Sequence, residues 1–174
     1  GYVVDVEETT EYDKLEMIDN EEKSIKFEHG TIISQKSYEY KDGKTYDVWK
    51  VRGDDNATKI FEFMSDNITG SHTKVEIGLA QTGIAGDKGL NFITTGHKRG
   101  SEPGLSYLYV NQIQYKYNLR AITHSHPNSS DIFKDDKSFA DVIYSNQKSN
   151  NLYLPSFYIY HVPTKTYKKY FPEK

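Results

Sequence analysis

Hydrophobic residues recur along this chain with two spacings, which predict strands and helices in one mixed domain. Apolar side chains three and four residues apart predict a helix over residues 56–68, with Ile60, Phe61, Met64 and Ile68 on one face. The same spacing predicts a second helix over residues 136–147. Short apolar runs bounded by turn residues predict strands over residues 31–34, 46–51, 73–82, 90–95, 105–110 and 119–123, and a closing hairpin over residues 156–162 and 167–171.

The first 24 residues differ from the rest of the chain. They are acidic, with low hydrophobicity and little periodicity. Such a composition favours a linker that follows something upstream, partly ordered on the folded domain. We therefore expect residues 1–24 to be an acidic N-terminal extension and residues 25–174 to form a single domain.

Composition excludes several functions for this 174-residue chain. A net charge of −3 gives no general attraction to nucleic acid or to anionic membranes. No apolar run is long enough to span a bilayer. The absence of cysteine removes disulfides, thiol metal ligands and thiol nucleophiles. Any metal chemistry must therefore use histidine and carboxylate groups.

Two histidines stand one residue apart at the end of an apolar strand, in the run Ala-Ile-Thr-His124-Ser-His126-Pro127. Residues i and i+2 of a strand point to the same side, so His124 and His126 can direct both imidazoles at one point. Pro127 then ends the strand, because proline cannot donate a backbone hydrogen bond. The pair is typical of a metal site, although two half-exposed strand-end histidines would give the same pattern.

An aspartate after this pair could complete a ligand set of two imidazoles and one carboxylate, which is usual for catalytic zinc. At about 100° per residue, Asp141 falls almost opposite the apolar face of the second helix. Asp136 lies about 60° from Phe139, in the first turn and toward the sheet. The geometry favours Asp136, and Asp141 stays open as the alternative.

A glutamate on an earlier strand is the remaining candidate. Val75, Ile77 and Leu79 share one face of the strand expected over residues 73–82, and Glu76 points the other way. Such a glutamate taken alone is usually a solvent-facing residue.

These residues, in this order, resemble the JAB/MPN metalloprotease fold with its JAMM motif. The elements that carry the resemblance are Glu76-Ile77-Gly78-Leu79, the strand that ends in His124-Ser125-His126-Pro127, and an aspartate at the next helix start. The stretches 60–67, 74–79, 136–140 and 155–160 are similar to one branch, the JAB-like toxin domains at the C-terminal ends of Rhs-type and other bacterial polymorphic toxins, notably in Bacteroidetes. The resemblance covers roughly residues 56–171 and implies an α/β (α+β) fold with a mixed, curved sheet flanked by one helix on each side.

The resemblance also implies the roles of the residues. His124, His126 and Asp136 would bind Zn²⁺, and Glu76 would take a proton from the water that the ion activates. The implied protein is a zinc-dependent peptidase or isopeptidase, secreted from a bacterial cell as the toxic end of a polymorphic toxin. Its partners would be a peptide or protein substrate in a target cell and a cognate immunity protein.

One position departs from the family pattern. The family carries a serine three residues before the ligand aspartate, but Phe133 stands three residues before Asp136. Ser130 is nearby, and Ser138 stands three residues before Asp141.

Two other hypotheses for the function remain. The domain could be a metal-free MPN-like binding module, or it could be a metal-dependent hydrolase of a non-peptide substrate.

Overall fold

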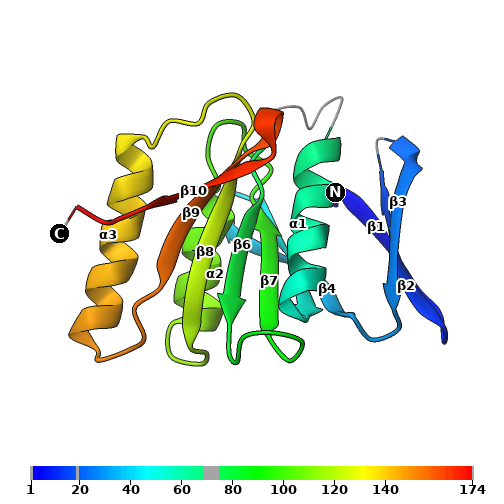
Figure 1. Cartoon of the computed structure of the whole chain (residues 1–174), viewed down its shortest axis with the longest axis horizontal. Coiled ribbons are helices and arrows are strands. Elements are labelled where there is room, and N and C mark those ends of the chain that lie inside the picture. The colour runs from blue at the N-terminus through cyan, green and yellow to red at the C-terminus, as the bar shows by residue number, and fades with distance from the viewer. Residues whose placement is uncertain (1, 19, 69–74, 174) are drawn as a thin grey trace.

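The computed structural model describes residues 2–18, 20–68 and 75–173. Within these residues, ten strands form two sheets, and three α-helices pack against them (Figure 1). The predicted mixed α/β (α+β) fold class is therefore confirmed. The larger sheet has the strand order β10-β9-β8-β6-β7-β5-β4. Its strands are β4 (Ile32–Lys41), β5 (Lys44–Arg52), β6 (Gly78–Thr82), β7 (Leu90–Thr95), β8 (Leu119–His126), β9 (Ser156–His161) and β10 (Thr166–Tyr170).

Neighbouring strands of the large sheet are antiparallel, except that β8 and β9 are parallel. Parallel neighbours need a crossover connection, and α3 (Lys134–Ser149) provides it. The chain therefore passes from the end of β8 through the loop of residues 127–133 into the beginning of α3. This connection brings the predicted histidine pair close to the predicted aspartate.

The two faces of the large sheet are buried against different helices, because successive side chains of a strand point to opposite faces. Trp49 and Ile93 pack on one face with residues of α1 (Asp54–Asn67). Val48 and Phe92 pack on the other face with residues of α2 (Pro103–Leu108) and α3. The expectation of one helix on each side therefore omitted α2, which shares its face with α3.

The helix predicted over residues 56–68 is present as α1, and its buried residues include Ile60, Phe61 and Met64 as predicted. It begins two residues earlier than predicted, after Gly53, whose φ of 87° lies in the region that favours glycine. The Asp54 carboxylate pairs with the Arg120 guanidinium at 2.8 Å, which ties the start of α1 to β8.

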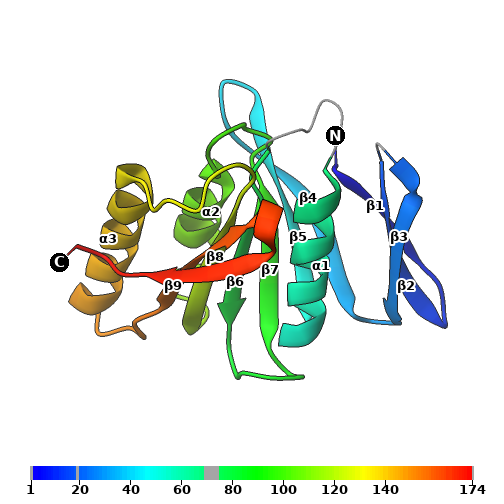
Figure 2. The same cartoon turned by 45° about the horizontal axis from the view of Figure 1, so that its top comes forward.

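The N-terminal segment forms a small sheet of β1 (Val4–Glu8), β2 (Tyr12–Met17) and β3 (Asn20–Glu28). This sheet lies beyond α1, at the end of the molecule opposite α3 (Figure 1, Figure 2). Leu15 and Met17 are buried in the same cluster as Trp49 and α1. The boundary expected after residue 24 falls inside β3. The interpretation of residues 1–24 as an extension that follows an upstream segment stays a prediction.

The strand predicted over residues 105–110 is wrong, because these residues belong to α2 and to a five-residue π-helix, η2 (Tyr109–Ile113). The Glu102 carboxylate accepts a hydrogen bond from the Gly104 N–H and caps α2, and Pro103 occupies the first turn, where no N–H is needed. Leu105, Leu108 and Tyr109 then face the sheet with helical spacing.

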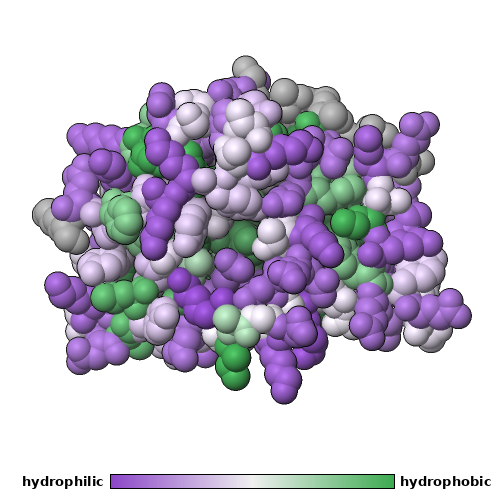
Figure 3. Space-filling model, in the orientation of Figure 1, coloured by the Kyte–Doolittle hydropathy of each residue, from purple (hydrophilic) through white to green (hydrophobic). Residues whose placement is uncertain are grey.

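The remaining predicted elements agree with the structure in part. The strand expected over residues 73–82 begins as β6 at Gly78, while Thr73 and Lys74 lie outside the described residues. Strands β9 and β10 form the predicted closing hairpin through the short turn η3 (Val162–Thr164). None of the helices in the described ranges has the length and apolar character needed to cross a membrane. The face drawn in Figure 3 is mostly hydrophilic, with small separated hydrophobic patches.

Candidate metal centre

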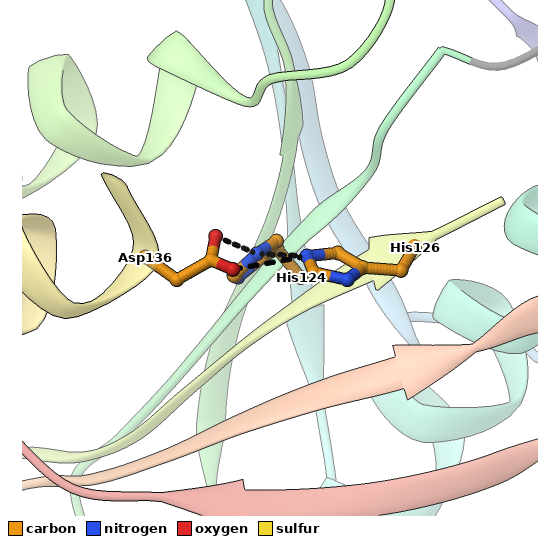
Figure 4. A group of neighbouring side chains, drawn as sticks. All are labelled: His124, His126 and Asp136. Atoms are coloured by element: carbon orange, nitrogen blue, oxygen red, sulfur yellow. Dashed lines mark hydrogen bonds and ion pairs between the residues drawn. The ribbon is translucent and has the colours of Figure 1, made fainter. Parts of the chain in front are cut away.

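The histidine pair lies at the end of β8, where the sequence predicts it. His124 and His126 are both buried, and both rings point from β8 toward the beginning of α3 (Figure 4). The Nε2 atoms of the two rings are 2.9 Å apart. The alternative of two half-exposed strand-end histidines is therefore wrong.

Asp136 meets this pair from the first turn of α3. Its Oδ1 lies 2.9 Å from Nε2 of His124, and its Oδ2 lies 3.5 Å from Nε2 of His126. Oδ2 also accepts a hydrogen bond of 2.8 Å from the Phe133 N–H, which fixes the carboxylate at the helix N-terminus. Asp141 lies elsewhere, because its Oδ1 accepts a hydrogen bond of 2.6 Å from the Glu173 N–H.

The hydrogen bonds of the histidines favour a form that can bind a metal ion. The Nδ1 of His126 lies 3.2 Å from the Ser129 carbonyl oxygen, which can only accept a hydrogen bond. Nδ1 therefore carries a hydrogen, so in the neutral ring Nε2 keeps the lone pair with which a histidine binds a metal ion, whereas in the protonated ring the Nε2–H faces Asp136. This arrangement presents two imidazole nitrogens and one carboxylate oxygen to a single point.

Burial and charge shift the pKa values of these three groups in different directions. Burial lowers the pKa of His124, although Asp136 opposes the effect. Burial also acts to lower the pKa of His126, but the hydrogen bond and charge of Asp136 outweigh it and raise the pKa. Although burial acts to raise it, the pKa of Asp136 is held well below its usual range by the hydrogen bonds from both histidines. Asp136 is therefore ionised at neutral pH.

Glu76 lies in the extended segment just before β6, and its side chain faces the same cleft as the histidines and Asp136. The residue is only 7% exposed. Burial raises the pKa of Glu76 to about 7, the charge of His126 opposes the shift, and that of Asp136 adds to it. The expectation that a lone strand glutamate faces solvent therefore does not hold here. A carboxyl group with a pKa near neutrality can both accept and release a proton.

Ser125 joins the Glu76 segment to the histidine strand. Its Oγ accepts a hydrogen bond of 2.8 Å from the Ile77 N–H, and its own N–H donates to the Ile77 carbonyl at 2.9 Å. In the same register, Gly78 of β6 lies opposite His124 of β8. These contacts place Glu76 at the level of the histidines.

The cleft that contains these residues has a volume of about 650 Å³ and lies between the beginnings of α2 and α3. Glu102, which caps α2, also lines it. The Oε1 of Glu102 accepts hydrogen bonds from Gly96 and Gly104, and burial raises its pKa well above the usual range, with a further rise from Glu76. The cleft therefore contains a second buried carboxyl group whose pKa is raised by burial.

The structure places the other candidates as follows. His97, in the loop after β7, lies 2.6 Å from the Asp47 carboxylate and does not line the cleft. Ser130 and Ser138 do not line the cleft either, whereas Ser129 does. Phe133 takes the place of the serine that the family pattern led us to expect.

Two residues of this site, Ser125 and Glu102, were not predicted from the sequence to have a role. An acidic residue followed by Pro103 is a helix-start signal, so Glu102 could have been recognised as the cap of a helix. The role of Ser125 has no such signal, because its partner Ile77 is distant in the sequence.

The three converging residues suit a metal ion by their chemistry. Among the residues that the structure describes, His124, His126 and Asp136 form a group whose candidate ligand atoms all lie within 4.8 Å of one another. Two neutral imidazoles and one ionised carboxylate are donors that zinc and other transition metals accept. The group could therefore hold a metal ion, with Glu76 beside it.

Comparison with known proteins identifies the family. A family model described as JAB-like toxin 1 matches residues 49–152, which include Glu76 and the three candidate ligands. No curated protein and no solved structure matches the chain. Since the match covers more than half of the 174 residues, the chain belongs to the JAB-like toxin 1 family and contains a toxin domain of the JAB type.

Proposed function

We propose that this domain is a zinc-dependent peptidase or isopeptidase of the JAMM type. The observation that carries the proposal is the position of Glu76, a buried carboxyl group with a pKa of about 7, in the same cleft as His124, His126 and Asp136. We propose that these three residues bind Zn²⁺ and that Glu76 is the general base. When bound, zinc would supply a Lewis acid for the scissile carbonyl and lower the pKa of water.

Glu76 would carry out both proton transfers of the reaction. Glu76, in its ionised form, accepts a proton from the attacking water as the new bond between oxygen and the carbonyl carbon forms. It then delivers that proton to the leaving nitrogen as the carbon–nitrogen bond breaks. The hydrogen bonds of Glu102 and of Ser125 fix the segments that surround Glu76.

The family indicates a setting for this activity. We propose that the domain is the toxic end of a secreted bacterial polymorphic toxin and that it cleaves a peptide or protein in the target cell. A producing cell that contains such a domain needs protection, so we also propose a cognate immunity protein that blocks the cleft. The net charge of −3 supports a protein rather than a nucleic acid as the substrate.

The test compares wild-type protein with Glu76→Gln, because glutamine keeps the shape of the side chain and cannot accept the proton. Both zinc-loaded proteins are incubated with lysate of a susceptible bacterium, and new peptide termini, including those of branched lysines, are identified by mass spectrometry. We expect new termini with the wild type and at least 100-fold fewer with Glu76→Gln, on the scale of a lost general base.

The alternatives give different results in this experiment. A wild-type protein that binds no zinc and produces no new termini would support a metal-free binding module. Zinc binding without new termini would favour hydrolysis of a non-peptide substrate. Equal cleavage by the wild type and Glu76→Gln would remove Glu76 from the mechanism.

A further inference from the structure

The cleft has an apolar wall that the proposed chemistry does not use. Among the residues that line it, Phe133 and Phe139 come from the α3 side, and Leu105 comes from α2 on the other side. Metal ligation and proton transfer need none of these side chains. Apolar surface in a cleft that also contains polar reactive groups is typical of a site that binds a side chain of the substrate.

Phe133 is the exposed member of this wall. Its side chain is among the exposed large hydrophobic residues, at 51%. Its ring stacks on the ring of His126, with the centroids 5.7 Å apart and the planes at 28°. The ring therefore lies directly beside the candidate ligands, where the reacting bond of a substrate would lie. Figure 3 shows hydrophobic surface at the end of α3 where the helix begins.

The position of Phe133 is fixed by the backbone and not by its ring. The Phe133 N–H donates to Asp136 Oδ2, and Phe133 is the residue from which α3 begins. A substitution of the side chain keeps this N–H, so it leaves the hydrogen bond to Asp136 in place.

The opposite side of the apolar wall is equally well defined. Leu105 is 2% exposed, and its side chain fills the space above Gly78, where an added Cβ would lie 2.5 Å from the Leu105 Cγ. Phe139 is partly buried against the core of the same face. The free space of the cleft therefore lies between the buried side chain of Leu105 on one side and the exposed ring of Phe133 on the other.

We propose that the substrate carries an aromatic or large aliphatic side chain directly beside the cleaved amide bond, and that this side chain packs between Phe133, Phe139 and Leu105. The inference rests on the proposed peptidase function and names its specificity. Burial of such a side chain would bring its apolar surface and that of Phe133 out of water together.

A peptide library with all residues at each position measures the specificity of the zinc-loaded wild type. We expect enrichment of Phe, Tyr, Leu, Ile or Met at one position that flanks the cleaved bond. A matched pair of peptides, with the preferred residue or alanine at that position, is then hydrolysed by the wild type, by Phe133→Ala and by Val142→Ala. Val142 is the control, since it is 60% exposed on α3 and does not line the cleft.

Phe133→Ala should lower kcat/KM for the preferred peptide by about tenfold, mainly through KM, and should leave the alanine peptide nearly unchanged. Val142→Ala should leave kcat/KM unchanged for both peptides. Unchanged zinc content and Tm of Phe133→Ala would show that the loss comes from substrate contact and not from damage to the site.

The outcomes separate this inference from the function on which it rests. Cleavage without enrichment of apolar residues beside the cleaved bond would overturn the inference and leave the peptidase function intact. An equal fall in kcat/KM of Phe133→Ala for the preferred peptide and for the alanine peptide would do the same. No cleavage of any peptide would overturn the peptidase function and the specificity with it.

Discussion

Ser125 and Ile77 share two hydrogen bonds, in which the Ile77 N–H donates to Ser125 Oγ at 2.8 Å and the Ser125 N–H donates to the Ile77 carbonyl at 2.9 Å. Ser125 lies between the two histidines, and Ile77 follows Glu76. This pair therefore connects the candidate base to the candidate metal ligands, although neither residue is expected to touch a substrate.

Replacement of Ser125 by alanine should loosen this connection. The Ile77 N–H would lose a hydrogen-bond acceptor in a buried position, which costs about 1–3 kcal/mol of unfolding free energy. We also expect kcat to fall, because Glu76 is no longer fixed beside the histidines. Urea denaturation measures the first effect, and Ser130→Ala, an exposed serine in the nearby loop, is the control. If both variants were equally stable, Ser125 would not have the structural role described here.

Asp136→Ala and Asp141→Ala should differ in metal content. Asp136 reaches both histidines, whereas Asp141 bonds to the C-terminal segment at Glu173. We expect Asp136→Ala to weaken zinc binding by at least the roughly 10–100-fold that is lost with outer-shell partners, and Asp141→Ala to leave it unchanged. Titration with zinc, followed by elemental analysis, measures this. The reverse result would make Asp141 the third ligand.

The metal-free protein should lose stability as the pH rises, because of Glu76. Burial raises the pKa of Glu76 from 4.5 to about 7, so the folded state favours the protonated form. Below pH 4.5 this group is protonated in both states, and above pH 7 folding must bury its charge. The folded state thus loses stability between these values, by up to about 3 kcal/mol.

Glu76→Gln isolates this effect, because glutamine does not ionise. Denaturation in the presence of a chelator at several pH values should show the variant gaining stability relative to the wild type between pH 5 and pH 8, by about 3 kcal/mol at most. A difference that is independent of pH would mean that Glu76 titrates alike in the folded and unfolded states.

Gly78→Ala should strain the floor of the cleft. An added Cβ would lie 2.5 Å from the Leu105 Cγ, and such overpacking costs about 1–3 kcal/mol. The double variant with Leu105→Ala should be less destabilised than the sum of the two single variants, since the smaller side chain makes room. Thermal or urea denaturation of the four proteins measures the coupling. If the losses of stability in the two single variants simply add up in the double variant, the strain does not come from contact between residue 78 and Leu105.

The histidine pair was predictable because it depends on local geometry. Alternate residues of a strand share a side, and proline ends the strand, so His124 and His126 could be placed without knowledge of the fold. Helical periodicity favoured Asp136 over Asp141 for the same reason. On α3 the apolar Val142 is exposed, whereas Ala140, Ile143 and Gln147 are buried, so apolar spacing alone does not define the buried face of this helix.

What the sequence could not show depends on contacts between distant segments. The register that places Glu76 beside the histidines depends on Ile77 and Ser125, and a pattern of hydrophobic residues does not define such a pairing. The strands before residue 25 could not be predicted, because their buried side chains pack on Trp49 and α1, which are distant in the sequence. The short apolar run over residues 105–110 suggested a strand, but these residues follow the helix cap at Glu102 and are helical.

The three candidate ligands come from one continuous stretch, residues 124–136, whereas Glu76 comes from a separate segment that pairs with β8. The proposed metal binding and the proposed hydrolysis therefore depend on separate segments of the sequence. Under the proposed function, a single substitution at Glu76, or a shift of the segment that carries it, would remove hydrolysis and leave the three candidate ligands in place. A descendant of such a toxin could thus lose its toxicity in one step and keep its shape, which is how a harmless binding protein could arise from this fold.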